Sequence, residues 1–313
     1  MKMGKITIKT GQELTLQESH NFFIRKCEVK NLAERTIGIY TEHFQMFQKF
    51  INDNEYGISD ISLRLVEDFT FHLMESKKRN NITVNMILRS IRAFLYFCMD
   101  ERYIPIFKIK MLKVDKEIKE TYTDTELGTL LKKPNLKASD FSEYKIWAFS
   151  NYLLGTGNRI SSALNIKITD LDFDNAVIRV NKAKNRKAQI IPLSHALSTV
   201  LREYLTYRKG ESTDFLFCNA YGDKPDIRTY QGMLASYNKR RGVVKTSAHL
   251  YRHTFAKKWI LNGGDIFRLQ KILGHSDLSV VKEYVNMFGG DLAVDFDRFN
   301  PLDSLEFRHT KEK

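Results

Sequence analysis

The spacing of apolar residues changes along this chain, and the change limits the folds open to it. In the first half, four apolar side chains recur at the spacing of one helical face: Tyr40, Phe44, Phe47 and Ile51. Residues 176–180 and 189–193 instead have the β-branched composition of strands, and they flank a polar, lysine-rich turn. The sequence therefore predicts a mainly α-helical chain with a small antiparallel β-sheet in its C-terminal half.

Length and helix-start signals predict two domains. A chain of 313 residues suits two domains that each bury a core. Capping-box patterns beginning at Thr15 and Thr123 open the two halves, and Pro105 is expected to end the last helix of the first half. We predict five regions: an extension at 1–14, a helical domain at 15–107, a basic linker at 108–120, a mixed α+β domain at 121–290 and a tail at 291–313.

The net charge predicts a polyanionic partner. The formal charge is +13 at pH 7. Residues 1–113 contain 18 Lys and Arg against 13 Asp and Glu, a net +5, and the remaining residues contain 32 against 24, a net +8. Because lysine and arginine release counterions when they bind phosphates, both halves are expected to contact nucleic acid. A basic, solvated surface without such a partner is the alternative.

Cysteine usage and hydropathy predict the compartment. Cys27, Cys98 and Cys218 are widely spaced and form no C-x-x-C pair, so we expect reduced structural thiols. No apolar run approaches the roughly 20 residues of a membrane span, and no signal-like apolar segment follows the first residues. We therefore expect a soluble, cytoplasmic protein without a membrane partner.

Residues that suit phosphodiester chemistry stand in short boxes of the C-terminal half. Arg159 lies in Gly-Thr-Gly-Asn-Arg-Ile-Ser, and His249 and Arg252 are one helical turn apart. His275 follows Gly274 at an expected helix end, and Tyr284 comes nine residues later. A guanidinium binds two phosphate oxygens, an imidazole moves a proton and a phenol can act as nucleophile. Each residue taken alone is more simply a surface, loop or core residue.

A metal site at His249 and His253 is the alternative for this helix. The two histidines are four residues apart, as zinc ligands on a helix are, but Leu250 stands where a zinc protease has its glutamate. We predict no metal and no cofactor.

The order of the boxes resembles that of the tyrosine recombinase, or phage-type integrase, family. Its catalytic domain has T-G-x-R-x-S, a hairpin lysine, H-x-x-R-H, L-G-H and a final tyrosine, and residues 120–290 match these in order. The helical first half resembles the family's DNA-clamping core-binding domain, so the resemblance implies a core-binding domain followed by a mixed α+β catalytic domain. It also implies six catalytic residues: Arg159, Lys184, His249, Arg252, His275 and Tyr284.

Two details of the match concern the hairpin and the first arginine. Among the three hairpin lysines, counting back from residues 190–193 selects Lys184, and Lys182 is the alternative. Three residues after the first arginine the family often has an acidic residue, and this chain has Ser162, which lacks the carboxylate that would help to orient neighbouring groups.

The resemblance implies strand cleavage without metal or ATP. Tyr284 would attack the scissile phosphate, form a 3′-phosphotyrosyl link and free a 5′-hydroxyl, while Arg159, Arg252 and His275 hold the phosphate. Lys184 would protonate the leaving oxygen. His249 would take the proton of the phenol or orient it.

The implied partners are double-stranded DNA with specific recombination sites, a homo-tetramer on synapsed DNA and a directionality or accessory protein. The tail has an apolar face and is predicted to dock on a neighbouring subunit. We favour a site-specific recombinase or integrase of a mobile element. The alternatives are a chromosome-dimer-resolving recombinase, a type IB topoisomerase and a DNA-binding accessory protein that does not cut.

Overall fold

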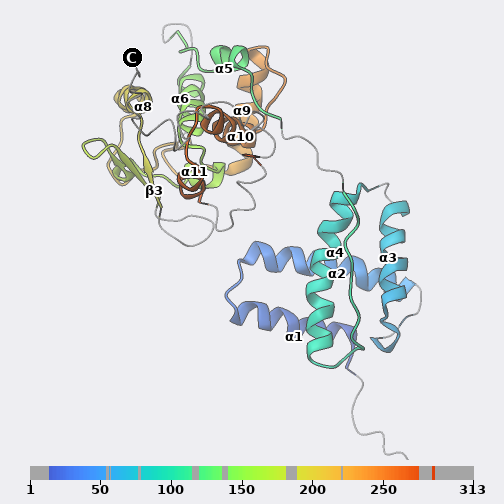
Figure 1. The fold of residues 1–313 in the computed structure, drawn as a ribbon. Helices are drawn as coiled ribbons and strands as arrows, with labels where there is room; N and C mark the ends of the chain where they lie inside the picture. The colour runs from blue at the N-terminus through green and yellow to red at the C-terminus, as the bar shows by residue number, and fades with distance from the viewer. Residues whose placement is uncertain are drawn as a thin grey trace, which may run out of the picture. The chain divides into compact units, whose positions relative to one another are not determined.

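The computed structural model of the chain divides into two compact units, residues 1–117 (unit 1) and residues 118–313 (unit 2), each visible in Figure 1. The structure describes the following residues: 14–53, 56, 58–76, 79–114, 120–135, 140–180, 189–219, 221–274 and 284–285. Lys182, Lys184, His275 and the tail 291–313 lie outside the described residues.

Unit 1 is helical, as predicted. Its elements are α1 (Leu16–Val29), α2 (Glu34–Asp53), the short 3-10 helix η1 (Ile58–Asp60), α3 (Leu63–Ser76) and α4 (Asn81–Asp100). The capping box at the start of α1 is confirmed, because Glu18 N–H donates to Thr15 Oγ1 (3.2 Å) and Thr15 N–H donates to Glu18 Oε2 (2.9 Å). In the predicted apolar stripe on α2, Phe44, Phe47 and Ile51 are core residues, and Tyr40 is partly buried.

Helix α4 differs from its prediction in two respects. It ends at Asp100, before Pro105, because Arg102 adopts a left-handed φ of 62° and Tyr103 N–H turns back to the Cys98 carbonyl oxygen (2.8 Å). By length and composition α4 is also apolar enough to cross a membrane. Most of that length is buried in unit 1, where α4 packs against α1, α2 and α3, so it is a core helix.

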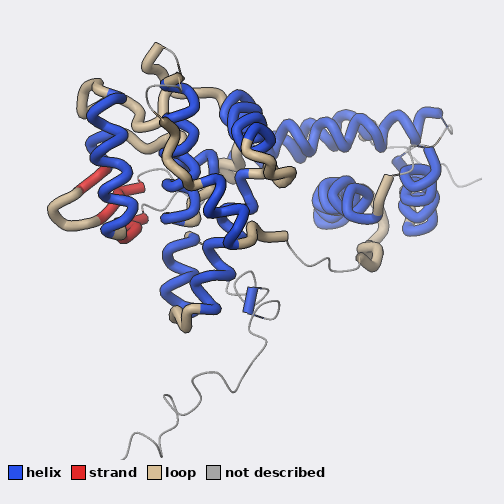
Figure 2. The backbone as a smooth tube through the Cα atoms, turned by 90° about the horizontal axis from the view of Figure 1, so that it is seen from above, coloured by secondary structure: helices blue, strands red, loops and turns tan. Residues whose placement is uncertain are grey.

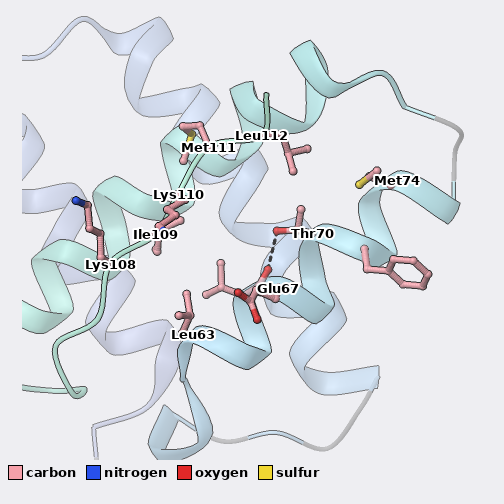
Figure 3. A pocket seen from close by; sticks show the side chains of 11 residues that line it. Leu63, Glu67, Thr70, Met74, Lys108, Ile109, Lys110, Met111 and Leu112 are labelled. Atoms are coloured by element: carbon pink, nitrogen blue, oxygen red, sulfur yellow. Dashed lines mark hydrogen bonds between the residues drawn. The ribbon is translucent and has the colours of Figure 1, made fainter. Parts of the chain in front are cut away.

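The chain after α4 runs in an extended conformation along unit 1. Asn85 of α4 holds it at both backbone groups of Leu112, accepting its N–H (2.8 Å) and donating to its carbonyl oxygen (2.9 Å). Residues 108–112 and α3 line a groove of about 420 Å³ (Figure 3). The first residues of the predicted linker therefore pack as part of unit 1.

The described residues of unit 2 form helices and three short strands, which confirms the predicted fold class. Its elements are α5 (Asp124–Leu130), α6 (Phe141–Thr156), α7 (Ile160–Ala163), η2 (Ile168–Asp170), β1 (Leu171–Asp172), β2 (Val177–Val180), β3 (Gln189–Pro192), α8 (His195–Arg208), α9 (Ile227–Arg240), α10 (Ala248–Leu261) and α11 (Ile266–Leu273). The strands pair antiparallel in the order β1-β2-β3, with Ile178 opposite Ile191. Figure 2 shows them together at one edge of the unit.

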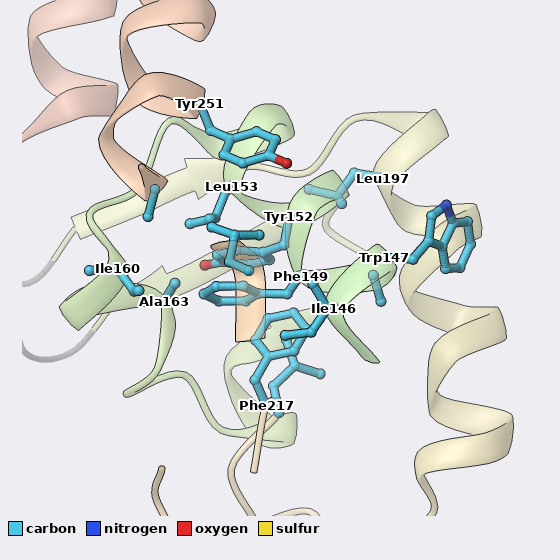
Figure 4. Close-up of a cluster of buried hydrophobic side chains, with 14 of the residues drawn as sticks. Ile146, Trp147, Phe149, Tyr152, Leu153, Ile160, Ala163, Leu197, Phe217 and Tyr251 are labelled. Carbon is cyan, nitrogen blue, oxygen red and sulfur yellow. The ribbon is translucent and has the colours of Figure 1, made fainter. Parts of the chain in front are cut away.

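Helix α6 is the centre of unit 2. Asp140 Oδ1 caps its N-terminus by accepting Glu143 N–H (2.7 Å). Helices α8, α9 and α10 pack against it, and Phe149, Tyr152 and Leu153 are fully buried among their side chains (Figure 4). Because α6 is covered on several sides, its C-terminal end is a firm support for the residues that follow it.

Candidate active site

The turn after α6 presents the first predicted arginine. α6 ends at Thr156, and Gly157 has a φ of 62°, the left-handed conformation that favours glycine. A side chain here would also collide, because its Cβ would lie 2.6 Å from Phe255 and 2.8 Å from Leu273. Arg159 follows immediately before α7 and is partly buried. The close packing of this turn explains why a glycine precedes the arginine box.

Asn158 fixes the backbone beside this arginine. Its side chain is buried and donates through Nδ2 to the Tyr152 hydroxyl (2.8 Å). Its N–H donates to Thr156 Oγ1 (3.2 Å). The position of Arg159 is thereby set by contacts within the core around α6.

Helix α10 carries His249 and Arg252 one turn apart, as the sequence predicts. Arg252 is only 5% exposed. Its guanidinium donates to the carbonyl oxygens of Gly157 (2.9 Å) and Leu273 (2.8 Å). One side chain therefore joins the turn after α6 to the C-terminal end of α11.

Three of the predicted residues share an electropositive site. Burial lowers the pKa of Arg159, and burial together with the nearby charge of Arg159 lowers the pKa of Arg252 to about 10. Loss of surrounding water, followed by the charges of Arg252 and Arg159, lowers the pKa of His249. Since these like charges repel one another, a bound anion such as a phosphodiester would stabilise them.

Tyr284 lies in the same site. Its side chain is 2% exposed. It belongs to a small apolar cluster of unit 2: Ala256, Leu269, Leu273 and Tyr284. The Tyr284 hydroxyl is 2.7 Å from Nδ1 of His253. The charge of the Tyr284 phenolate and a hydrogen bond to Tyr284 raise the pKa of Arg252, which opposes the effect of burial. The structure thus brings together four of the six predicted residues: Arg159, His249, Arg252 and Tyr284.

The other two predicted residues, Lys184 and His275, lie outside the described residues, as does the alternative Lys182. Their roles therefore stay predictions. The residues that flank them are described, and they meet. Gln189, at the start of β3, donates through Nε2 to the carbonyl oxygens of Lys271 (2.7 Å) and Ile272, in the last turn of α11. The base of the lysine hairpin is therefore attached to the helix that leads into His275.

His253 and Gln189 are the residues that reasoning from the sequence missed. His253 stands inside the H-x-x-R-H box, and the sequence suggests it only as a zinc ligand, although its place one turn after His249 is a usable signal. Gln189 has no comparable signal, because its contact joins residues more than 80 positions apart. Within the described part of the chain, no group of three or more His, Cys, Asp or Glu could hold a metal ion.

The helical architecture and this site together place the protein in the class of enzymes that break and rejoin DNA with a tyrosine. The phage integrase family matches residues 121–289, and the phage integrase SAM-like domain matches residues 20–117. The chain belongs to the phage integrase family and is a tyrosine recombinase.

Individual relatives agree with this assignment. The chain is 26% identical to tyrosine recombinase XerD of Staphylococcus epidermidis over 282 residues, which are 87% of this chain and 94% of XerD. Its fold is similar to that of the Tn1549 transposon integrase in complex with a circular intermediate DNA, with a TM-score of 0.70, 21% identity and coverage of 85% and 94% of the two chains. A lambda integrase dimer bound to a core site matches with a TM-score of 0.68, 15% identity and coverage of 85% and 97%.

Proposed function

We propose that this chain is a site-specific recombinase that cuts and rejoins double-stranded DNA through a 3′-phosphotyrosyl link on Tyr284. The observation that carries the proposal is the Tyr284 hydroxyl, 2.7 Å from His253 and beside Arg252, within one chain. The net charge of +13 supports a DNA partner, as do the DNA complexes of the Tn1549 and lambda integrases.

The proposed reaction uses the site as follows. Arg159 and Arg252 bind the non-bridging oxygens of the scissile phosphate, where negative charge grows in the transition state. The Tyr284 oxygen forms a bond to phosphorus, and the bond to the 5′-oxygen breaks. Lys184 gives a proton to that oxygen, and His275 helps to hold the phosphate. Because the phosphotyrosyl link conserves the energy of the broken bond, rejoining to another 5′-hydroxyl requires neither ATP nor a divalent metal.

Trapping on a nicked suicide substrate tests this proposal. Wild-type protein is expected to form a covalent DNA adduct with and without chelator, and Tyr284→Phe is expected to form none, because it lacks the nucleophilic oxygen. Tyr251→Phe is the matched control: Tyr251 lies on α10, but its hydroxyl contacts Ser150 Oγ (3.2 Å) in the core. Adduct formation by Tyr284→Phe, or loss of the wild-type adduct with chelator, would contradict the proposal.

We further propose a homo-tetramer on synapsed DNA in which the tail 291–313 docks on a neighbouring subunit. The apolar spacing of four tail residues supports it: Leu292, Ala293, Phe296 and Phe299. Truncation after Gly290 is expected to abolish assembly on two DNA sites while single-site binding persists. Assembly by the truncated protein would refute tail docking.

The biological role that we propose is integration or excision of a mobile element, and the fold similarity to the Tn1549 transposon integrase supports it. The similarity to XerD supports chromosome dimer resolution as the second candidate. Sequencing the DNA that is covalently attached to Tyr284 in cells separates them, since element ends support the first role and a single chromosomal locus supports the second. Recombinant products from two cognate sites distinguish a recombinase from a topoisomerase.

A further inference from the structure

We propose that His253 holds the Tyr284 hydroxyl and accepts its proton during strand cleavage, the role that the sequence predicts for His249. The assignment rests on the proposed function of Tyr284. Nδ1 of His253 lies 2.7 Å from the phenol oxygen, and the two rings are 5.7 Å apart between centroids. His253 is partly buried on α10, a helix that packs against α6, so its backbone is well supported.

Arg252 is a second group that acts on the phenol oxygen. Arginine has only N–H donors, so the hydrogen bond between Arg252 and Tyr284 uses a lone pair of the phenol oxygen. The phenol proton can then point at His253. Nδ1 accepts it when the imidazole is neutral and has its own hydrogen on Nε2. Arg252 therefore orients a lone pair of the Tyr284 oxygen, and His253 orients its proton.

His249 has different neighbours. It lies one turn before His253, keeps a solvent-exposed face, and its pKa is lowered by the charges of Arg252 and Arg159. These two arginines are the groups that suit the phosphate. The two histidines of the H-x-x-R-H box thus have different neighbours. His249 lies beside the arginines that suit the phosphate, and His253 lies against the phenol.

The proton balance of the step is simple. The O–H bond of Tyr284 breaks and an N–H bond forms at His253 Nδ1, while the phenol oxygen bonds to phosphorus. The bond from phosphorus to the 5′-oxygen breaks, and that oxygen receives a proton from Lys184. In rejoining, His253 returns its proton to the leaving phenol oxygen, so the same residue acts in both directions.

The test compares His253 variants on two substrates under single-turnover conditions. One substrate is an ordinary suicide DNA, and the other has sulfur in place of the scissile 5′-oxygen, so that its leaving group needs no proton. His253→Ala is expected to cleave both at least about 100-fold more slowly than wild type, the usual contribution of a positioned acid–base group, with DNA binding unchanged. Lys184→Ala, which lacks the leaving-group acid, is expected to recover on the sulfur substrate.

Isosteric variants separate the Nδ1 contact from general damage to the fold. His253→Asn places an acceptor near the position of Nδ1 and is expected to cleave about tenfold faster than His253→Gln, whose polar atoms lie near that of Nε2. Exposed His195 of α8 gives the control His195→Ala, with wild-type rates expected. Cleavage by His253→Ala within about threefold of wild type, its recovery on the sulfur substrate, or equal rates of the Asn and Gln variants would overturn the assignment. Adducts on Tyr284→Phe would instead overturn the proposed function.

Discussion

A pair of histidines in unit 1 and a pair in unit 2 have different neighbours. In unit 1, His20 stacks on Phe44 with 3.7 Å between ring centroids, and His43 Nδ1 is 2.8 Å from Ser90 Oγ. Burial lowers the pKa of both and brings that of His20 to about 4. These imidazoles therefore stay neutral near pH 7 and serve as core side chains.

In unit 2, His249 and His253 adjoin two guanidiniums and a phenol. Burial alone therefore does not make a histidine functional. What distinguishes the second pair is contact with groups that can bind a phosphate or attack it.

The largest expected effect comes from the arginine that holds the unit 2 site together. Arg252→Lys keeps the charge but cannot donate to both carbonyl oxygens and a phosphate, so the rate of adduct formation should fall at least about 100-fold. Arg208→Lys is the matched control, because this partly buried arginine donates to the Phe215 carbonyl oxygen (3.1 Å) and its replacement should affect stability only. If Arg252→Lys formed the adduct at a rate near that of wild type, Arg252 would not be a phosphate-binding group. The histidines of unit 2 would then no longer differ from those of unit 1 by lying next to such a group.

A smaller effect is expected at the attachment of the hairpin. Gln189→Ala removes the donor to Lys271 and Ile272, which frees the base of the hairpin from α11. We expect cleavage to slow about tenfold, the equivalent of about 1.4 kcal/mol, with DNA binding unchanged. Ile190→Ala, at an exposed neighbouring position, is the control. Equal single-turnover rates for the two variants would show that the attachment is structural only.

The smallest expected effect is in unit 1 and concerns stability alone. Because the pKa of His20 is about 4 when folded and about 6.5 when unfolded, the unfolded chain binds more protons between these values. The free energy of unfolding should therefore fall as pH decreases through this window, by about 2 kcal/mol at pH 5. His20→Phe should remove most of this dependence in urea denaturation and leave DNA cleavage unchanged. A His20→Phe variant that cleaves slowly would contradict the structural role.

Local features of both units could be predicted from the sequence. The capping box at Thr123 is confirmed, since Glu126 N–H donates to Thr123 Oγ1 (3.2 Å), and the one-turn spacing of His249 and Arg252 holds on α10. Capping and helical spacing depend on residues three or four apart, so the sequence contains them directly.

The polar contacts of the site could not be predicted in this way. Arg252 reaches a carbonyl oxygen 95 residues away, and His253 meets Tyr284 across 31 residues. Such contacts arise only when α6, α10 and α11 pack, and periodicity carries no information about them. The early end of α4 has a different, local cause: Arg102 adopts a left-handed conformation that an arginine in the sequence does not signal.

Peptide mapping of the trapped protein–DNA adduct tests the central claim most directly. After digestion of the protein and the DNA, mass spectrometry should find the nucleotide on the peptide that contains Tyr284, attached through its 3′-phosphate. A nucleotide on any other residue, or an attachment through a 5′-phosphate, would contradict the account.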